Sequence, residues 1–201
     1  MAATLTARSN CIDVGANFGG MLADMVRLAP EGEHYAFEPI PQLADALRER
    51  HPDVRVATVA LAATSGRAEF QFVPDNPGLS GLSVGKAGDL PRATIEVTLA
   101  RLDDVLPTDY LPTLIKVDVE GAELGVFEGA VETLLRARPV LVFEHSRNLA
   151  PHFNTEPRQV HELLTKLGYR LFDLDGTGPY DLTAFEIAFR THARFNWLAR
   201  A

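Results

Sequence analysis

Short apolar runs alternate with longer amphipathic segments along most of the chain. The runs that predict strands are 11–14, 33–38, 54–59, 114–119, 140–144, 169–174 and 195–199. Residues at helical spacing predict helices over 20–29, 41–50, 122–137, 158–167 and 182–191. Strands and helices that alternate in this way form βα units, which build a mostly parallel sheet with helices on both faces. The sequence therefore predicts a Rossmann-like α/β fold.

The alternation is interrupted once, in the middle of the chain. Segments 67–73 and 94–99 show the two-residue period of strands, and 74–91 between them is rich in Gly, Ser and Pro. We expect a hairpin with a long loop. Such a loop either borders a ligand site or is a surface insertion, and the sequence leaves both alternatives open.

Length and composition narrow the class of protein. A chain of 201 residues with 46% hydrophobic residues can bury one core, so we expect a single domain over 1–201. The formal net charge of −8 argues against nucleic acid as a partner. The single cysteine, Cys11, excludes an intramolecular disulfide, and no segment resembles a signal peptide or a membrane span. We expect a cytoplasmic protein without a membrane partner, of undetermined oligomeric state.

A glycine turn follows the first predicted strand. Gly15 and Gly19 lie where strand meets helix, so the backbone can approach a ligand closely and the helix N-terminus can receive a negative group. Glu38 ends the second predicted strand, where a carboxylate can accept hydrogen bonds from both ribose hydroxyls. Together these residues predict a site for an adenosine-type cofactor.

The turn favours one such cofactor over another. A dinucleotide fingerprint needs glycine where this chain has Asn17, and a carboxylate at Asp13 would repel phosphates but attract an ammonium group. No tyrosine is followed by lysine at the spacing of short-chain dehydrogenases, and 81–86 is too short for a P-loop. The pattern favours S-adenosylmethionine over NAD.

Four segments carry a resemblance to a known family: Ile12-Asp13-Val14-Gly15-Ala16-Asn17, Ala36-Phe37-Glu38-Pro39, Leu102-Asp103-Asp104 and Ile115-Lys116-Val117-Asp118-Val119-Glu120-Gly121-Ala122-Glu123. With these motifs the chain resembles the FkbM family of methyltransferases from Ile12 onward. The resemblance implies a class I methyltransferase fold, with seven mostly parallel strands and a reversed hairpin at one edge. It also implies S-adenosylmethionine as methyl donor and a hydroxyl of a small molecule, a natural product or a sugar, as acceptor.

The resemblance also implies which residues contact the cofactor. Its methionine end is expected at the glycine turn, at Asp13, Gly15, Ala16, Asn17, Phe18 and Gly19, and its ribose at Glu38. The adenine is expected to lie against Pro39, Ile40, Ala60 and Leu61, for which ordinary core packing is the alternative. A lid over the site would come mainly from 74–91.

Candidates for the chemical step lie at the carboxyl ends of the central strands, where ligands of open α/β sheets bind. His145 is the best candidate for a general base, since a neutral imidazole accepts a proton near pH 7; an exposed loop histidine is the alternative. Asp118 could contact the cofactor's amino group or orient the acceptor, and Glu120 and Glu144 are further candidates. Glu123 is assigned to the start of the following helix.

No metal site is predicted, because Asp118 and Glu144 alone do not establish one. Two other functions stay open from the residues. One is an NAD(P)-dependent oxidoreductase on a Rossmann sheet, and the other is a module that binds the cofactor without catalysis.

Overall fold

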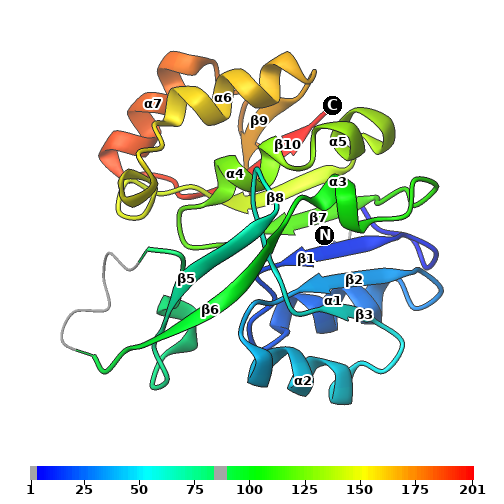
Figure 1. Ribbon diagram of the computed structural model, residues 1–201. Helices are drawn as coiled ribbons and strands as arrows, with labels where there is room; N and C mark the ends of the chain where they lie inside the picture. The colour runs from blue at the N-terminus through cyan, green and yellow to red at the C-terminus, as the bar shows by residue number, and fades with distance from the viewer. Residues whose placement is uncertain (1–3, 84–89) are drawn as a thin grey trace.

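A seven-stranded sheet forms the centre of the computed structural model, which describes residues 4–83 and 90–201 (Figure 1). The strands in spatial order are β3 (Arg55–Ala57), β2 (His34–Phe37), β1 (Cys11–Val14), β7 (Leu114–Val117), β8 (Val140–Glu144), β10 (Asn196–Arg200) and β9 (Arg170–Asp173). Neighbouring strands are parallel except at β10, which runs antiparallel to both β8 and β9. The predicted seven-stranded, mostly parallel sheet is confirmed, and the reversal expected as a hairpin at one edge is the antiparallel pair of β10 with the edge strand β9.

Helices cover both faces of this sheet, as predicted. On one face, the sheet packs against residues of α3 (Leu102–Val105), α4 (Glu123–Glu128), α5 (Val131–Ala137), α6 (Pro157–Lys166) and α7 (Leu182–Thr191). On the other face lie α1 (Gly20–Leu28) and α2 (Pro41–Arg50). Successive residues of a strand point to opposite faces, so Ile12 and Val14 join the first core while Cys11 packs on Met25 of α1. No helix in the described part of the chain is long and apolar enough to cross a membrane.

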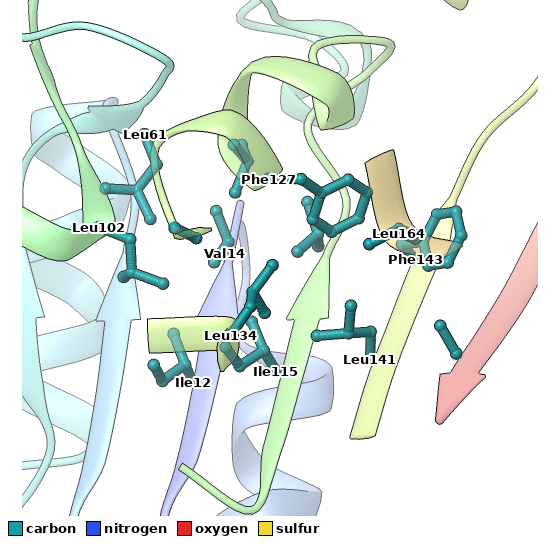
Figure 2. Packing of buried hydrophobic residues seen from close by; sticks show 14 of the residues in the cluster. Ile12, Val14, Leu61, Leu102, Ile115, Phe127, Leu134, Leu141, Phe143 and Leu164 are labelled. Carbon is teal, nitrogen blue, oxygen red and sulfur yellow. The ribbon is translucent and has the colours of Figure 1, made fainter. Parts of the chain in front are cut away.

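The larger core lies beneath α4 and α5. Figure 2 shows Val14 of β1, Ile115 of β7 and Phe143 of β8 on this side of the sheet, together with Phe127 of α4 and Leu134 of α5. All five side chains are at most 1% exposed. This packing fixes the carboxyl ends of β1 and β7 relative to each other.

The predicted hairpin is also present and forms a second, smaller sheet. Its strands are β4 (Ala60–Leu61), β6 (Ala93–Ala100) and β5 (Gly66–Phe72) in that order, with β5 and β6 antiparallel. A short 3-10 helix, η1 (Pro77–Leu79), follows β5, and another, η2 (Ala150–Phe153), follows β8. Residues 84–89 of the predicted long loop lie outside the described part of the chain.

Two predicted elements differ in the structure. The strand predicted over 54–59 is shortened to β3, and the chain then leaves the main sheet to form β4. The helix predicted over 122–137 is two helices that separate at Gly129, where a Cβ atom would lie 2.1 Å from the Ala62 carbonyl oxygen. The helix periodicity did not reveal this close approach, because it depends on a segment distant in the sequence.

Candidate cofactor and active site

A cavity of about 290 Å³ opens at the carboxyl ends of β1, β2 and β7. Its volume is near the lower end of the range for small-molecule sites, ~300–1,000 Å³. Its lining comes from the glycine turn, from the residues after β2, from the start of the second sheet, from the loop after β7 and from the segment around η1, with these members: Val14, Gly15, Ala16, Asn17, Phe18, Gly20, Met21, Phe37, Glu38, Pro39, Ile40, Val59, Ala60, Leu61, Phe70, Pro77, Gly78, Ser80, Gly81, Leu82, Lys116, Asp118, Val119, Glu120 and Ala122.

The glycine turn connects β1 to α1 through backbone conformations that glycine favours. Gly15 has φ +71° and Gly19 has φ +77°, and Asn17 between them also lies in the left-handed region at +48°. The amides of Gly15 and Ala16 both donate to the Phe37 carbonyl, at 3.0 and 3.2 Å. A Cβ on Gly15 would lie 1.9 Å from the Asp118 carbonyl oxygen. The turn therefore holds the ends of β1, β2 and β7 in close contact.

We expect Gly15→Ala to disrupt this junction, while Gly20→Ala should be tolerated. An alanine in the left-handed region costs roughly 1–2 kcal/mol, and at position 15 it must also displace the Asp118 backbone. Position 20 also lines the cavity but has open space around its Cβ direction. Thermal unfolding of the two variants checks the prediction, and equal melting temperatures would contradict it.

Glu38 closes the cavity at the end of β2. Its carboxylate accepts hydrogen bonds from the amides of Asn17, at 2.8 Å, and Ile40, at 3.0 Å. Burial raises the pKa of Glu38, and the two backbone bonds partly offset that rise because they favour the ionised form. Each carboxylate oxygen keeps a further lone pair that can accept a hydroxyl from the cavity.

Apolar side chains form the part of the cavity next to Glu38. Ile40 and Ala60 belong to one buried cluster with Phe70 of β5, and Leu61 is 3% exposed. Such a slot suits a flat heteroaromatic ring, and its members come from both sheets. The four residues predicted at the adenine, Pro39, Ile40, Ala60 and Leu61, all line it.

The loop after β7 brings two further carboxylates, those of Asp118 and Glu120, to the cavity. The Asp118 amide donates to the Val14 carbonyl at 3.1 Å, and its side chain is 42% exposed. Glu120 has φ +55°, an uncommon conformation for a residue other than glycine. Burial, together with the nearby charges of Asp118, Glu144 and Glu123, raises the pKa of Glu120 to about 8. Glu120 therefore holds a proton at neutral pH that an ordinary glutamate would have lost.

A buried ion pair lies next to these carboxylates, and its lysine, Lys116, also lines the cavity. Lys116 of β7 stands opposite Asp13 of β1, and its Nζ is 3.1 Å from Asp13 Oδ1. The same Nζ donates to the Gly15 carbonyl at 2.7 Å and lies 3.7 Å from Asp118 Oδ2. Burial raises the pKa of Asp13, and the Lys116 ammonium counteracts that rise.

The hairpin supplies the remaining wall. Pro77, Gly78, Ser80, Gly81 and Leu82 line the cavity, so the described part of the predicted long loop borders the site rather than forming a detached insertion. A Cβ on Gly81 would lie 3.6 Å from Glu120 Cβ, which shows how closely this wall approaches the loop after β7.

Most of the residues predicted for the site meet in this cavity, and four do not line it. Asp13 is fully buried beneath Lys116, and Gly19 packs against α2, where its Cβ would lie 2.5 Å from Leu47 Cδ2. Glu144 ends β8 outside the lining, from where its charge acts on Glu120.

His145 is the fourth predicted residue that does not line the cavity. Its ring is fully buried and stacks on Phe189, with ring centroids 5.0 Å apart, and its Nδ1 is 3.5 Å from Glu123 Oε2. Leu141, Phe143 and His145 alternate along β8, so His145 points to the face that α6 and α7 cover. The structure does not bring His145 to the cavity, so its predicted role as general base has no geometric support.

Lys116 is the charged lining residue to which sequence reasoning gave no role. The signal was present: a lysine in the middle of an otherwise apolar buried strand requires a partner, and Asp13 occupies the same position in another such strand. No group of three His, Cys, Asp or Glu within residues 4–83 and 90–201 is arranged to hold a metal ion.

The strand order, the single antiparallel strand beside the edge and the glycine turn facing a buried glutamate define the class I methyltransferase fold. A family model for the methyltransferase FkbM domain matches residues 13–171. The chain belongs to the FkbM methyltransferase family, which confirms the resemblance seen in its motifs.

Individual relatives agree with this assignment. The chain is similar to methyltransferase sdnD of Sordaria araneosa, at 31% identity over 65% of this chain and 63% of the relative. It is also similar to the 2-O-methyltransferase NoeI of Sinorhizobium fredii, at 29% identity over 63% of this chain and 59% of the relative. The matched part thus spans about three fifths of each curated relative. A crystal structure of methyltransferase FkbM from Methylobacillus flagellatus KT shares the fold, with a TM-score of 0.59 and 17% identity over 98% of this chain and 44% of that one.

Proposed function

We propose that this chain binds S-adenosylmethionine and transfers its methyl group to a hydroxyl of a small molecule. The observation that carries the proposal is the charge of the cavity. Its described lining contains the carboxylates Glu38, Asp118 and Glu120 but a single cation, Lys116, which is paired with Asp13. A cationic nucleoside suits this cavity, whereas a pyrophosphate does not.

The residues present fit such a nucleoside from end to end. Glu38 would accept the ribose hydroxyls, and the apolar slot of Ile40, Ala60 and Leu61 would hold the adenine. Asp118 would receive the ammonium group of the methionine end. Sequence reasoning considered both Asp13 and Asp118 for that role; Lys116 neutralises Asp13, so Asp118 supplies the negative charge, and Glu120 adds to it only when it loses its proton.

S-adenosylmethionine supplies a methyl group on a sulfonium, which makes alignment of the acceptor the main task of the protein. Glu120 lies in the cavity beside the wall formed by Gly81 and Leu82. We assign it the role of general base, because a carboxylate with a raised pKa is a better proton acceptor than an ordinary one. The similarity to a 2-O-methyltransferase supports oxygen as the nucleophile.

The wall around Glu120 also bears on the acceptor. Phe70, Pro77 and Leu82 are apolar, and the Ser80 hydroxyl accepts a hydrogen bond from the Val73 amide at 3.0 Å. An uncharged acceptor with an apolar body and a free hydroxyl matches these surroundings.

Calorimetry with S-adenosylhomocysteine, S-adenosylmethionine and NAD tests the proposal. We expect binding of the first two and none of NAD. Glu38→Gln keeps the shape of the side chain but weakens acceptance of the ribose, so affinity for S-adenosylhomocysteine should fall roughly 10- to 100-fold. Glu96→Gln, on the exposed hairpin, is the matched control and should bind like the wild type. Binding of NAD by the wild type, with no binding of S-adenosylhomocysteine, would favour an oxidoreductase instead.

A further inference from the structure

Lys116 occupies a position where an apolar residue would be the ordinary choice. It lies in β7 between Ile115 and Val117, both 1% exposed, and is itself 8% exposed. Its strand neighbour Asp13 is completely buried. Replacing a buried ion pair by apolar residues of similar volume is often neutral or stabilising, so such a pair is weak evidence of a purely structural role.

The contacts of the Lys116 ammonium join three separate segments. Nζ reaches Asp13 in β1 at 3.1 Å, the Gly15 carbonyl in the glycine turn at 2.7 Å and Asp118 in the loop after β7 at 3.7 Å. A fourth oxygen, the carbonyl of Val14, lies at 3.4 Å. The ammonium donates hydrogen bonds to the two carbonyls, and its contacts with the two carboxylates are ion pairs. All of the contacts lie where the glycine turn meets the loop after β7.

We propose that Lys116 is a positioning residue for the amino-acid end of the cofactor. By holding the Gly15 carbonyl and drawing the Asp118 carboxylate toward β1, it sets the place where an ammonium group is received. The inference rests on the proposed function, since it concerns how S-adenosylmethionine and its product are bound.

The electrostatics of the other groups agree with this role. The positive charge of Lys116 lowers the pKa of Glu38 and of Glu120, against the larger effect of burial on each. Lys116 thus keeps Asp118 in place without giving the cavity an uncompensated positive charge, because Asp13 balances it from below. A cavity arranged in this way distinguishes a ligand that carries an amino-acid group from one that does not.

Two ligands isolate that distinction. S-adenosylhomocysteine carries the amino-acid end, and 5′-deoxy-5′-methylthioadenosine shares the adenosine but lacks the ammonium and carboxylate. The variant to test is Asp13→Asn combined with Lys116→Met, which removes both buried charges and avoids leaving one unpaired. Lys166→Met, an exposed lysine in α6, is the matched control. Affinities are measured by calorimetry, and folding is checked by thermal unfolding.

We expect the double variant to lose affinity for S-adenosylhomocysteine roughly 10- to 100-fold, with its affinity for methylthioadenosine within about twofold of the wild type. Equal losses for both ligands, or no loss for either, would overturn the role of Lys116 while leaving the proposed function standing. If the wild type itself binds neither ligand, the proposed function fails, and this inference fails with it.

Discussion

Lys116→Met alone should lower the free energy of unfolding at pH 7 by about 3–5 kcal/mol, the usual effect of removing one partner of a buried ion pair. The variant leaves the Asp13 carboxylate fully buried with no cation beside it. Urea unfolding followed by circular dichroism measures the loss. The double variant with Asp13→Asn should recover most of it, because neither charge then remains.

The pH dependence of the single variant provides a second measurement. Burial already raises the pKa of Asp13 in the presence of Lys116, and loss of the ammonium raises it further. A carboxyl whose pKa is higher in the folded than in the unfolded state contributes most to the free energy of unfolding at low pH. This contribution is lost as the pH rises. The loss of unfolding free energy in Lys116→Met should therefore become smaller as the pH falls toward the ordinary pKa of aspartate. A deficit independent of pH, or equal in the double variant, would contradict the assignment.

The order of strands and helices was predictable because it depends on local periodicity. Each of the seven predicted strand runs overlaps a strand of the main sheet, and the glycine turn and Glu38 lie together in the cavity. These residues come directly after the strand ends in the sequence. In a parallel sheet the carboxyl ends of the strands lie at the same edge. Sequence spacing was sufficient for this part of the site.

The roles of side chains near the strand ends were harder to predict because they depend on which face each residue takes. His145 has the same alternation as Leu141 and Phe143, so it enters the core beneath α7 rather than the cavity. Lys116 and Asp13 alternate to the opposite face, where α1 covers them. Asp13 and Lys116 are far apart in the sequence, and only the pairing of β1 with β7 reveals that they are partners.

Glu120→Gln should slow methyl transfer by roughly 10²–10⁴-fold, the usual contribution of a positioned general base. Wild-type activity should rise with pH through about 8, because Glu120 must lose its proton before it can accept one. The variant should lack this rise. Formation of S-adenosylhomocysteine in a screen of uncharged alcohols and sugars gives the rates. Glu128→Gln, exposed on α4, serves as control, and an unchanged rate in Glu120→Gln would exclude the assigned role.

Proton release on binding tests Glu120 without any acceptor. At pH 7 the free protein holds a proton on Glu120, and a cation that enters the cavity favours the carboxylate. S-adenosylmethionine carries the additional positive sulfonium that S-adenosylhomocysteine lacks, so its binding should release more protons. Calorimetry in buffers of different ionisation enthalpy measures that difference, and Glu120→Gln should abolish it. If the difference persists in the variant, another group carries the proton. If the wild type shows no difference, the sulfonium cation does not bind near Glu120. A base at that position could then not act on an acceptor held against the methyl group.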